Sequence, residues 1–278
     1  METYSHDGLI FDVTDAGPSD GRLVIALHGF PEDRHCWRQI TSRLNDSGYR
    51  VLAPDQRGYS PAARPAGRRS YVASKLDRDV LALADAAEVD RFDVVGHDWG
   101  GLVAWDLAAR HPDRVRSVAS LSTPHPRALI DSMLRSTQLL HSWYMGFFQL
   151  PWVPERVLGL GGGSRGVDAL VRGGLDKASA ERYAVRFADP AAMTGPLNWY
   201  RALPLGQRDP TPNVGVPALY VWSDGDRFLT RSAAERTRSY VTGPYRFEVL
   251  AGQNHWLPTN AAAEVAPLLL DHLAAASE

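Results

Sequence analysis

Cysteine is almost absent from this chain, since Cys36 is the only one among 278 residues. A single cysteine cannot form an intramolecular disulfide, so a reducing compartment is the expected location. The N-terminal stretch METYSHDGLIFDVTDAG has no apolar run long enough for a signal peptide. No run elsewhere approaches the roughly 18 apolar residues of a membrane span. These absences together predict a cytoplasmic protein.

The chain also lacks a strong excess of either charge. Lys and Arg total 30 and Asp and Glu total 32, a formal net charge of −2, and the basic residues are scattered. This distribution predicts neither nucleic acid nor an anionic membrane as a partner. Cys and His are not clustered at metal-ligand spacing, so we expect no metal. Nothing in the sequence indicates an oligomeric state.

Short apolar, β-branched runs alternate with helical patterns, which indicates a mostly parallel sheet flanked by helices. The fold class is therefore α/β. Strands are predicted in 22–29, 49–58, 91–98, 115–123, 216–226 and 245–254, and helices in 36–46, 71–89, 99–111, near 230–240 and in 261–276.

This alternation stops between Pro124 and Pro212, where the sequence becomes aromatic and helical with Pro- and Gly-rich joints. We therefore expect a core of residues 1–123 and 213–278, and an inserted helical cap of residues 124–212. Ligands bind outside the carboxyl ends of the strands in such sheets, so a cap there would help enclose a pocket. The GGGSRG stretch at 161–166 lacks the strand and the Gly-Lys ending of a phosphate loop, and is interpreted as a flexible joint.

The stretch VVGHDWGG, residues 94–101, places a carboxylate where many hydrolases have serine. Gly96, Gly100 and Gly101 surround Asp98 at the end of a predicted strand and the start of a predicted helix. This pattern is typical of a nucleophile elbow, a sharp turn that needs small neighbours. The alternative is an Asp that only caps the helix. Capping does not require the flanking glycines, so a nucleophilic Asp98 is favoured.

Such an elbow needs an acid and a histidine from later strand ends, in that order along the chain. His255, in GQNHWLP, is the one histidine that follows the last predicted strand. WSDGDRFL offers two acids, Asp224 and Asp226. Asp226 is preferred because it lies farther beyond its strand, whereas Asp224 precedes Gly225 as a turn residue would.

HGFP, residues 28–31, directly follows the first predicted strand. The backbone N–H groups of Phe30 and Trp99 are the candidates for an oxyanion hole. For His28 the favoured interpretation is a hydrogen-bonding residue that shapes the loop. Trp99 is also expected to line the pocket, with simple packing as the alternative.

HGFP and GHDWGG, together with the acid and the histidine, resemble the α/β-hydrolase superfamily and specifically its epoxide hydrolase branch, over about residues 20–275. The resemblance implies an α/β-hydrolase fold and two cap tyrosines that donate to the epoxide oxygen. WYMGFFQLPWVPE (143–155) is similar to the first tyrosine motif and implies Tyr144. GPLNWYRAL (195–203) is more similar to the second and implies Tyr200. For both tyrosines packing is the alternative, and it is favoured for Trp143 and Trp152.

The implied reaction opens an epoxide to a vicinal diol through an ester on Asp98, which water activated by His255 then hydrolyses. It implies no metal and no organic cofactor. The substrate would be small and apolar, since apolar cap residues are expected to line the pocket: Phe147, Phe148, Leu150 and Met193.

Three other functions remain open. A haloalkane or haloacid dehalogenase would use the same Asp nucleophile. Phe30 and the tyrosine pair argue against a haloalkane dehalogenase. Trp99, where a haloacid dehalogenase usually has Arg, argues against a haloacid dehalogenase. A binding protein that has lost turnover is opposed by the complete set of catalytic groups. An esterase is opposed because acyl transfer to Asp98 would form an anhydride.

Overall fold

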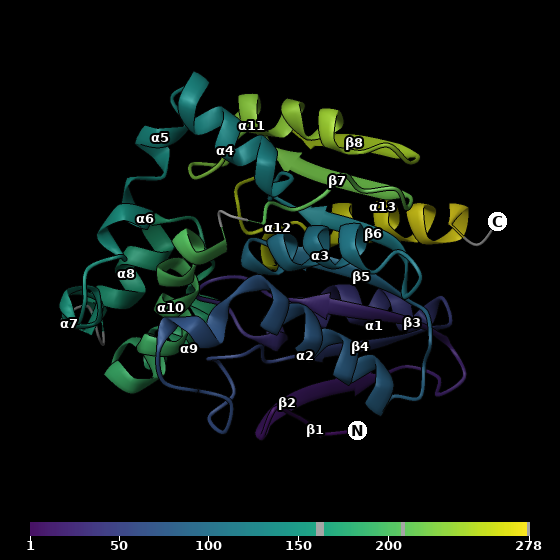
Figure 1. Cartoon of the computed structure of the whole chain (residues 1–278), viewed down its shortest axis with the longest axis horizontal. Helices are drawn as coiled ribbons and strands as arrows, with labels where there is room; N and C mark the ends of the chain where they lie inside the picture. The colour runs from purple at the N-terminus through teal and green to yellow at the C-terminus, as the bar shows by residue number, and fades with distance from the viewer. Residues whose placement is uncertain (160–163, 207–208, 277–278) are drawn as a thin grey trace.

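The computed structural model describes residues 1–159, 164–206 and 209–276. They form an eight-stranded sheet in the order β1-β2-β4-β3-β5-β6-β7-β8 (Figure 1). The strands are β1 (Thr3–His6), β2 (Leu9–Ala16), β3 (Arg22–Leu27), β4 (Tyr49–Pro54), β5 (Phe92–His97), β6 (Val115–Leu121), β7 (Ala218–Ser223) and β8 (Tyr245–Leu250). β1 pairs with β2, and β2 with β4, in antiparallel fashion. From β4 onward in this order, each strand pairs in parallel with the next. The expected mostly parallel sheet is confirmed.

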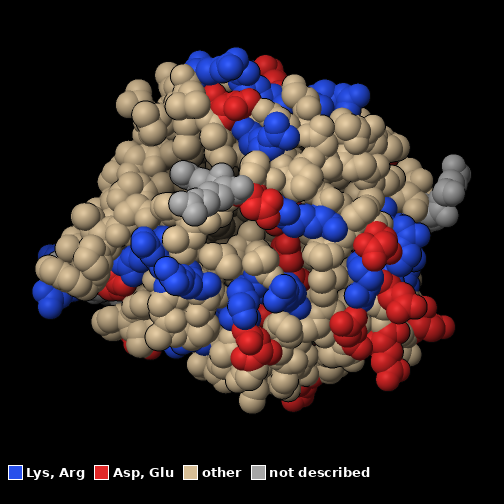
Figure 2. Space-filling model, viewed as in Figure 1, with Lys and Arg blue, Asp and Glu red and all other residues tan. Residues whose placement is uncertain are grey.

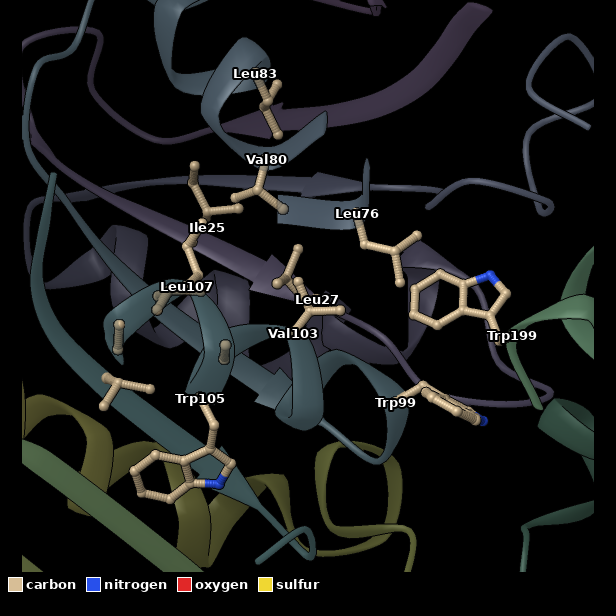
Figure 3. Close-up of a cluster of buried hydrophobic side chains, with 14 of the residues drawn as sticks. Ile25, Leu27, Leu76, Val80, Leu83, Trp99, Val103, Trp105, Leu107 and Trp199 are labelled. Carbon is tan, nitrogen blue, oxygen red and sulfur yellow. The ribbon is translucent and has the colours of Figure 1, made fainter. Parts of the chain in front are cut away.

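Helices cover both faces of the sheet, as the apolar composition of its central strands requires. One face packs against α1 (Arg38–Asp46), α12 (Leu257–Asn260) and α13 (Ala262–Ala275). The other packs against α2 (Ala73–Ala86) and α3 (Trp99–Arg110). Figure 3 shows this second core, where Ile25 and Leu27 of β3 meet Val80 of α2 and Val103 of α3. The remaining core elements are α11 (Arg231–Arg236) and the 3₁₀ helices Arg34–Trp37, Arg68–Tyr71 and Thr237–Tyr240.

Seven helices lie between β6 and β7, and no strand occurs in the described residues of 124–212. They are α4 (Pro126–Arg135), α5 (Gln138–His141), α6 (Trp143–Phe147), α7 (Val153–Gly159), α8 (Ser164–Arg172), α9 (Lys177–Phe187) and α10 (Pro190–Gly206). In Figure 1 they gather at one end of the sheet, on the left of the view. The helical character expected for this insertion is therefore observed.

Two contacts hold α10 against the core. Gly195 meets Gly58, where a Cβ built on Gly195 would lie 2.6 Å from the Gly58 Cα, so neither backbone has room for a side chain at the crossing. One helical turn later, the Trp199 indole N–H donates to the Arg57 carbonyl oxygen at 2.8 Å. The helix that carries Tyr200 is thus tied to the loop after β4.

The sequence missed the first two strands of the chain. β2 alternates, with Phe11 and Val13 buried and their neighbours less so, which is the pattern of a strand with one face in the core. β1, which pairs with β2 alone, is the edge strand of the sheet. The packing role favoured for two cap tryptophans is wrong, since Trp143 is 69% and Trp152 61% exposed. Of the predicted joint at 161–166, residues 161–163 lie outside the described part of the chain, and 164–166 begin α8.

Within the described residues, no helix has both the length and the apolar character needed to cross a bilayer.

Candidate active site

Asp98 occupies a strained turn between β5 and α3, with φ 50° and ψ −118°. Such a backbone conformation is costly for a residue with a side chain and persists only where the surroundings enforce it. The flanking glycines allow it by close contact. A Cβ on Gly96 would lie 2.1 Å from the Gly100 carbonyl oxygen, and one on Gly100 would lie 2.1 Å from the Leu27 carbonyl oxygen. The strand, the turn and the helix are therefore packed backbone to backbone around Asp98.

The Asp98 carboxylate does not cap α3, because its side chain makes no capping hydrogen bond. Instead Oδ1 accepts the backbone N–H of Phe30 at 2.8 Å. Gly29 permits this approach, since a Cβ there would lie 2.4 Å from the Asp98 Cβ. Among the described residues, the Trp99 amide makes no hydrogen bond to this carboxylate. Of the two predicted oxyanion donors, Phe30 therefore already contacts the carboxylate in this structure.

Asp226 and His255 lie together on the other side of Asp98. The distance from His255 Nδ1 to Asp226 Oδ2 is 2.8 Å, and that from His255 Nε2 to Asp98 Oδ2 is 3.6 Å. The second Asp226 oxygen accepts the backbone N–H groups of Phe228 and Leu229 at 2.7 and 3.0 Å. The imidazole thus lies between two carboxylates that follow β7 and β5.

Asp224, the other candidate acid, lies elsewhere. Its Oδ1 accepts the backbone N–H of Gly252 at 2.7 Å, which closes a turn between the ends of β7 and β8. Asp224 is exposed, whereas the Asp226 side chain has no solvent exposure. Of these two acids, only Asp226 contacts His255.

The two carboxylates control the charge of His255. Burial by itself would lower the histidine pKa, but Asp226 and Asp98 outweigh it and raise the pKa of His255 to about 10. Burial would raise the pKa of Asp98, yet the hydrogen bond and charge of His255 keep that pKa below its usual value. The resting site at neutral pH is therefore a carboxylate paired with an imidazolium.

Tyr144 and Tyr200 come together from α6 and α10, with ring centroids 6.0 Å apart. The Tyr200 ring also packs edge-on against Trp99 and Phe30, at centroid distances of 4.8 and 5.6 Å. Neither phenol donates a hydrogen bond to another described residue. Burial, followed by the Asp98 charge, raises the pKa of both phenols above the usual value of 10. Both stay protonated, and both lie within the electrostatic field of Asp98.

A second buried histidine–carboxylate pair, which the sequence did not reveal, supports His255. The distance from His97 Nδ1 to Glu32 Oε2 is 2.6 Å, and both side chains have no solvent exposure. His97 Nε2 lies 2.8 Å from the His255 backbone oxygen, which also accepts the Ser122 hydroxyl at 2.7 Å. In the sequence, only position could have indicated this pair, since Glu32 directly follows HGFP and His97 directly precedes Asp98.

His28 has the structural role expected of it. Its Nε2 accepts the backbone N–H of Gln56 at 3.1 Å, so Nδ1 carries the proton and donates to the Gly29 carbonyl oxygen at 3.0 Å. Burial lowers the pKa of His28, and the neutral ring joins the loop after β3 to the loop after β4.

An apolar cavity of about 740 Å³ lies beside this site, between α2, α3, α4 and α10. Trp99 and Trp199 form its wall toward the site, and Figure 3 shows the two indoles close together, with centroids 5.5 Å apart. Trp99 therefore lines a pocket, as expected. None of the four apolar cap residues expected to line the pocket lines this cavity. Phe148 and Met193 are buried, Phe147 is half-buried and Leu150 is 46% exposed.

No group of three or more His, Cys, Asp or Glu side chains within the described ranges has a geometry suited to a metal ion.

Comparison with known proteins agrees with this geometry. The family model for the alpha/beta hydrolase fold matches residues 22–260. The chain therefore belongs to the α/β-hydrolase fold family. It is 33% identical to epoxide hydrolase A of Mycobacterium tuberculosis, over 96% of this chain and 95% of that one. It is 36% identical to the AB hydrolase superfamily protein YfhM of Bacillus subtilis, over 96% and 95%.

The crystal structure of epoxide hydrolase A from Mycobacterium thermoresistibile superposes with a TM-score of 0.78 at 30% identity, covering 98% of this chain and 97% of the other. Human epoxide hydrolase 4 is 33% identical over 90% of this chain and 72% of its own length. Within the family, the chain lies in the epoxide hydrolase branch.

Proposed function

We propose that this protein hydrolyses epoxides to vicinal diols, with Asp98 as nucleophile. The observation that supports this most is the set of groups around one carboxylate. His255 lies 3.6 Å from it, and two protonated phenols lie within its field on the cap side. Relatives that cover almost the whole chain are named epoxide hydrolases. Residues 124–212 are assigned to the cap, and 1–123 with 213–278 to the core.

Ring opening begins when an Asp98 oxygen attacks one epoxide carbon and forms an ester bond. The carbon–oxygen bond of the ring breaks, and its electron pair stays on the departing oxygen. That oxygen takes a proton from Tyr144 or Tyr200, whose hydroxyls have no competing acceptor among the described residues. General acid catalysis of this kind contributes about 10²–10⁴-fold.

His255 must lose its proton before it can act as the base of the second step. Ester formation removes the Asp98 charge, which is one of the two charges that hold the imidazolium proton. The phenolate left by ring opening is strongly basic because burial disfavours its charge. The imidazolium proton passes to the phenolate, which becomes a phenol again, and His255 becomes neutral. The first half of the reaction thus prepares the base for the second.

Hydrolysis of the ester follows. His255, oriented by Asp226, takes a proton from water while the water oxygen attacks the Asp98 ester carbonyl. The oxyanion is stabilised by the Phe30 amide and by the Trp99 amide at the start of α3. When the intermediate collapses, the diol oxygen takes the proton from His255. The new Asp98 carboxyl group then protonates His255, which restores the starting pair.

The apolar surroundings of Tyr200 favour a small apolar epoxide, with water as the second substrate. The groups required by these steps all come from this chain. A cytoplasmic location stays a prediction, in keeping with the single, buried Cys36.

The test is product analysis on matched substrates, an apolar epoxide and the corresponding chloroalkane. We expect diol from the epoxide and no halide from the chloroalkane. Halide release without diol would instead establish a dehalogenase. Stoichiometric binding of the epoxide without product, even after long incubation, would establish an inactive binding protein.

A further inference from the structure

Exposed apolar side chains are concentrated on the helical insertion. Among the described residues, eleven large hydrophobic side chains are exposed, and ten of them lie between Ile130 and Val185. Ile10 is the exception. Monomeric proteins scatter such residues singly over their surface, so a concentration on one segment indicates a contact surface.

Five of these side chains follow one another over α4 to α6. They form the apolar patch, defined as Ile130, Leu134, Leu139, Leu140 and Trp143. Leu134 is 82%, Leu140 73% and Trp143 69% exposed. Ile130 and Leu134 lie four positions apart on α4 and therefore on one side of that helix.

The apolar patch continues into the interior of the protein. Ile130, Leu134 and Leu139 also line the 740 Å³ cavity whose inner wall is formed by Trp99 and Trp199. The surface on which the patch lies is therefore also the mouth of this cavity. A partner covering this patch would have direct access to the cavity.

The insertion and the core carry opposite charges, which the whole-chain value of −2 conceals. Residues 124–212 contain ten Lys or Arg and seven Asp or Glu, a formal charge of +3. The remaining residues contain 20 and 25, a formal charge of −5. The earlier expectation that the protein avoids anionic membranes was based on the whole-chain value.

The positive charge of the insertion is available at its surface. Five arginines are exposed and form no ion pair within the described residues: Arg135, Arg156, Arg165, Arg172 and Arg182. Most acids of the insertion already have partners. Glu155 pairs with Arg201, Glu181 with Lys177, Asp189 with Arg64, Asp209 with Arg110, and Asp131 accepts from Tyr240.

A further cation, Arg227, lies beside the apolar patch. The distance from His141 Nδ1, on α5, to the Arg227 carbonyl oxygen is 2.8 Å, and Arg227 Nη1 donates to the Arg172 carbonyl oxygen at 3.1 Å. Figure 2 shows the side over α5 to α7, at the left, as mostly tan with blue groups and little red, while red gathers at the lower right. On this side of the molecule, cationic groups therefore lie among uncharged residues, with few acidic groups beside them.

We propose that the apolar patch, together with Arg135, Arg172 and Arg227 beside it, docks the protein on an anionic lipid surface. Amphipathic helices with Trp and Leu beside Arg bind the interface between headgroups and acyl chains in this way. Anionic headgroups match the exposed arginines, and the acyl region matches the patch. A second copy of this chain fits less well, because two insertions of charge +3 would face each other.

The experiment is flotation of the full chain with vesicles of phosphatidylcholine alone and with about 30% phosphatidylglycerol. We expect binding to the anionic vesicles, weaker binding to the neutral ones, and release by high salt. The variant Leu139→Ser/Leu140→Ser/Trp143→Ser should bind at least tenfold more weakly, since the apolar contribution is lost. Each of Arg135→Gln and Arg172→Gln should weaken partitioning roughly fivefold.

Ile10→Ser is the matched control, because it removes an exposed apolar side chain that lies outside the insertion. This variant should bind vesicles as the unsubstituted chain does. Circular dichroism and thermal unfolding verify that each variant is folded. The proposal is overturned if the unsubstituted chain does not float with anionic vesicles, or if the patch variant floats equally well. A dimer in light scattering that the patch variant abolishes, without vesicle binding, also overturns it and assigns the patch to a second copy. None of these measurements depends on epoxide turnover, so they test docking separately from the proposed function.

Discussion

His97 donates a hydrogen bond to the backbone carbonyl of His255, with 2.8 Å between the imidazole Nε2 and the oxygen. A carbonyl can only accept, so Nε2 carries a proton, and Nδ1 faces the Glu32 carboxyl group. The pair contacts the loop that carries His255 and does not contact the Asp98 carboxylate. His97 and Glu32 are therefore positioning residues.

The first prediction concerns this pair. Glu32→Leu leaves a buried imidazole without its partner, and we expect the free energy of unfolding to fall by about 3–5 kcal/mol. Glu32→Gln keeps a hydrogen-bonding side chain, so it should retain most of the stability. In both variants ester hydrolysis should slow more than ring opening, because His255 acts in the second step. Single-turnover kinetics measure the two rates separately, and an equal loss in both would contradict a positioning role.

The second prediction separates the two chemical steps at their reacting groups. His255→Gln should still open the ring but accumulate the Asp98 ester, since water is no longer activated. Intact-protein mass spectrometry should then show the mass of the protein plus one substrate. Asp98→Asn is the companion variant, with no adduct and steady turnover reduced by about 10⁴-fold or more. Normal turnover by His255→Gln without adduct would refute the two-step mechanism.

The third prediction tests the tyrosines. Tyr144→Phe and Tyr200→Phe each leave one phenol, so each should slow ring opening by about tenfold or more. The double variant should lose about 10²–10⁴-fold. Burst kinetics of ester formation give this rate directly. Tyr245→Phe is the control, since its buried hydroxyl has no hydrogen-bond partner in the described structure. If the double variant opened the ring as fast as this control, Tyr144 and Tyr200 would have only a packing role.

The fourth prediction follows from the pKa of His255, which is raised from 6.5 to about 10. The folded state binds this proton more tightly than the unfolded state does. Its contribution to stability is therefore complete below about pH 6.5 and is lost as the pH rises through about 10. Thermal unfolding between about pH 7 and about pH 10 should show a smaller decline for His255→Gln than for the unsubstituted chain. Identical slopes would exclude the shifted pKa.

The sequence was sufficient for those parts of the fold that local pattern determines. The parallel strands are continuous apolar runs, and the turn at Asp98 requires glycines at fixed spacing, so both are visible in a single chain. Asp226 could be preferred over Asp224 because distance beyond the strand decides which acid reaches His255.

What the sequence did not reveal depends on contacts between distant segments. β1 is an edge strand of only four residues, and the alternation of β2 is weak beside the long apolar runs. The Glu32–His97 contact joins residues 65 positions apart, and no local pattern marks Glu32. Trp143 and Trp152 were expected in the core because aromatic residues usually are, but Trp143 at the start of α6 and Trp152 just before α7 are both exposed. The basic character of residues 124–212 is visible in the distribution of charges along the chain but not in their sum.

The insertion leaves the sheet after β6 and returns before β7, whereas Asp98, Asp226 and His255 follow β5, β7 and β8. Residues that would hold and protonate a substrate are thus encoded in one continuous stretch of the gene, apart from those that would form and cleave the ester. Recombination or repeated mutation can exchange that stretch and leave the hydrogen bonds of the sheet intact. New substrates are therefore accessible to descendants of this protein through replacement of a single segment.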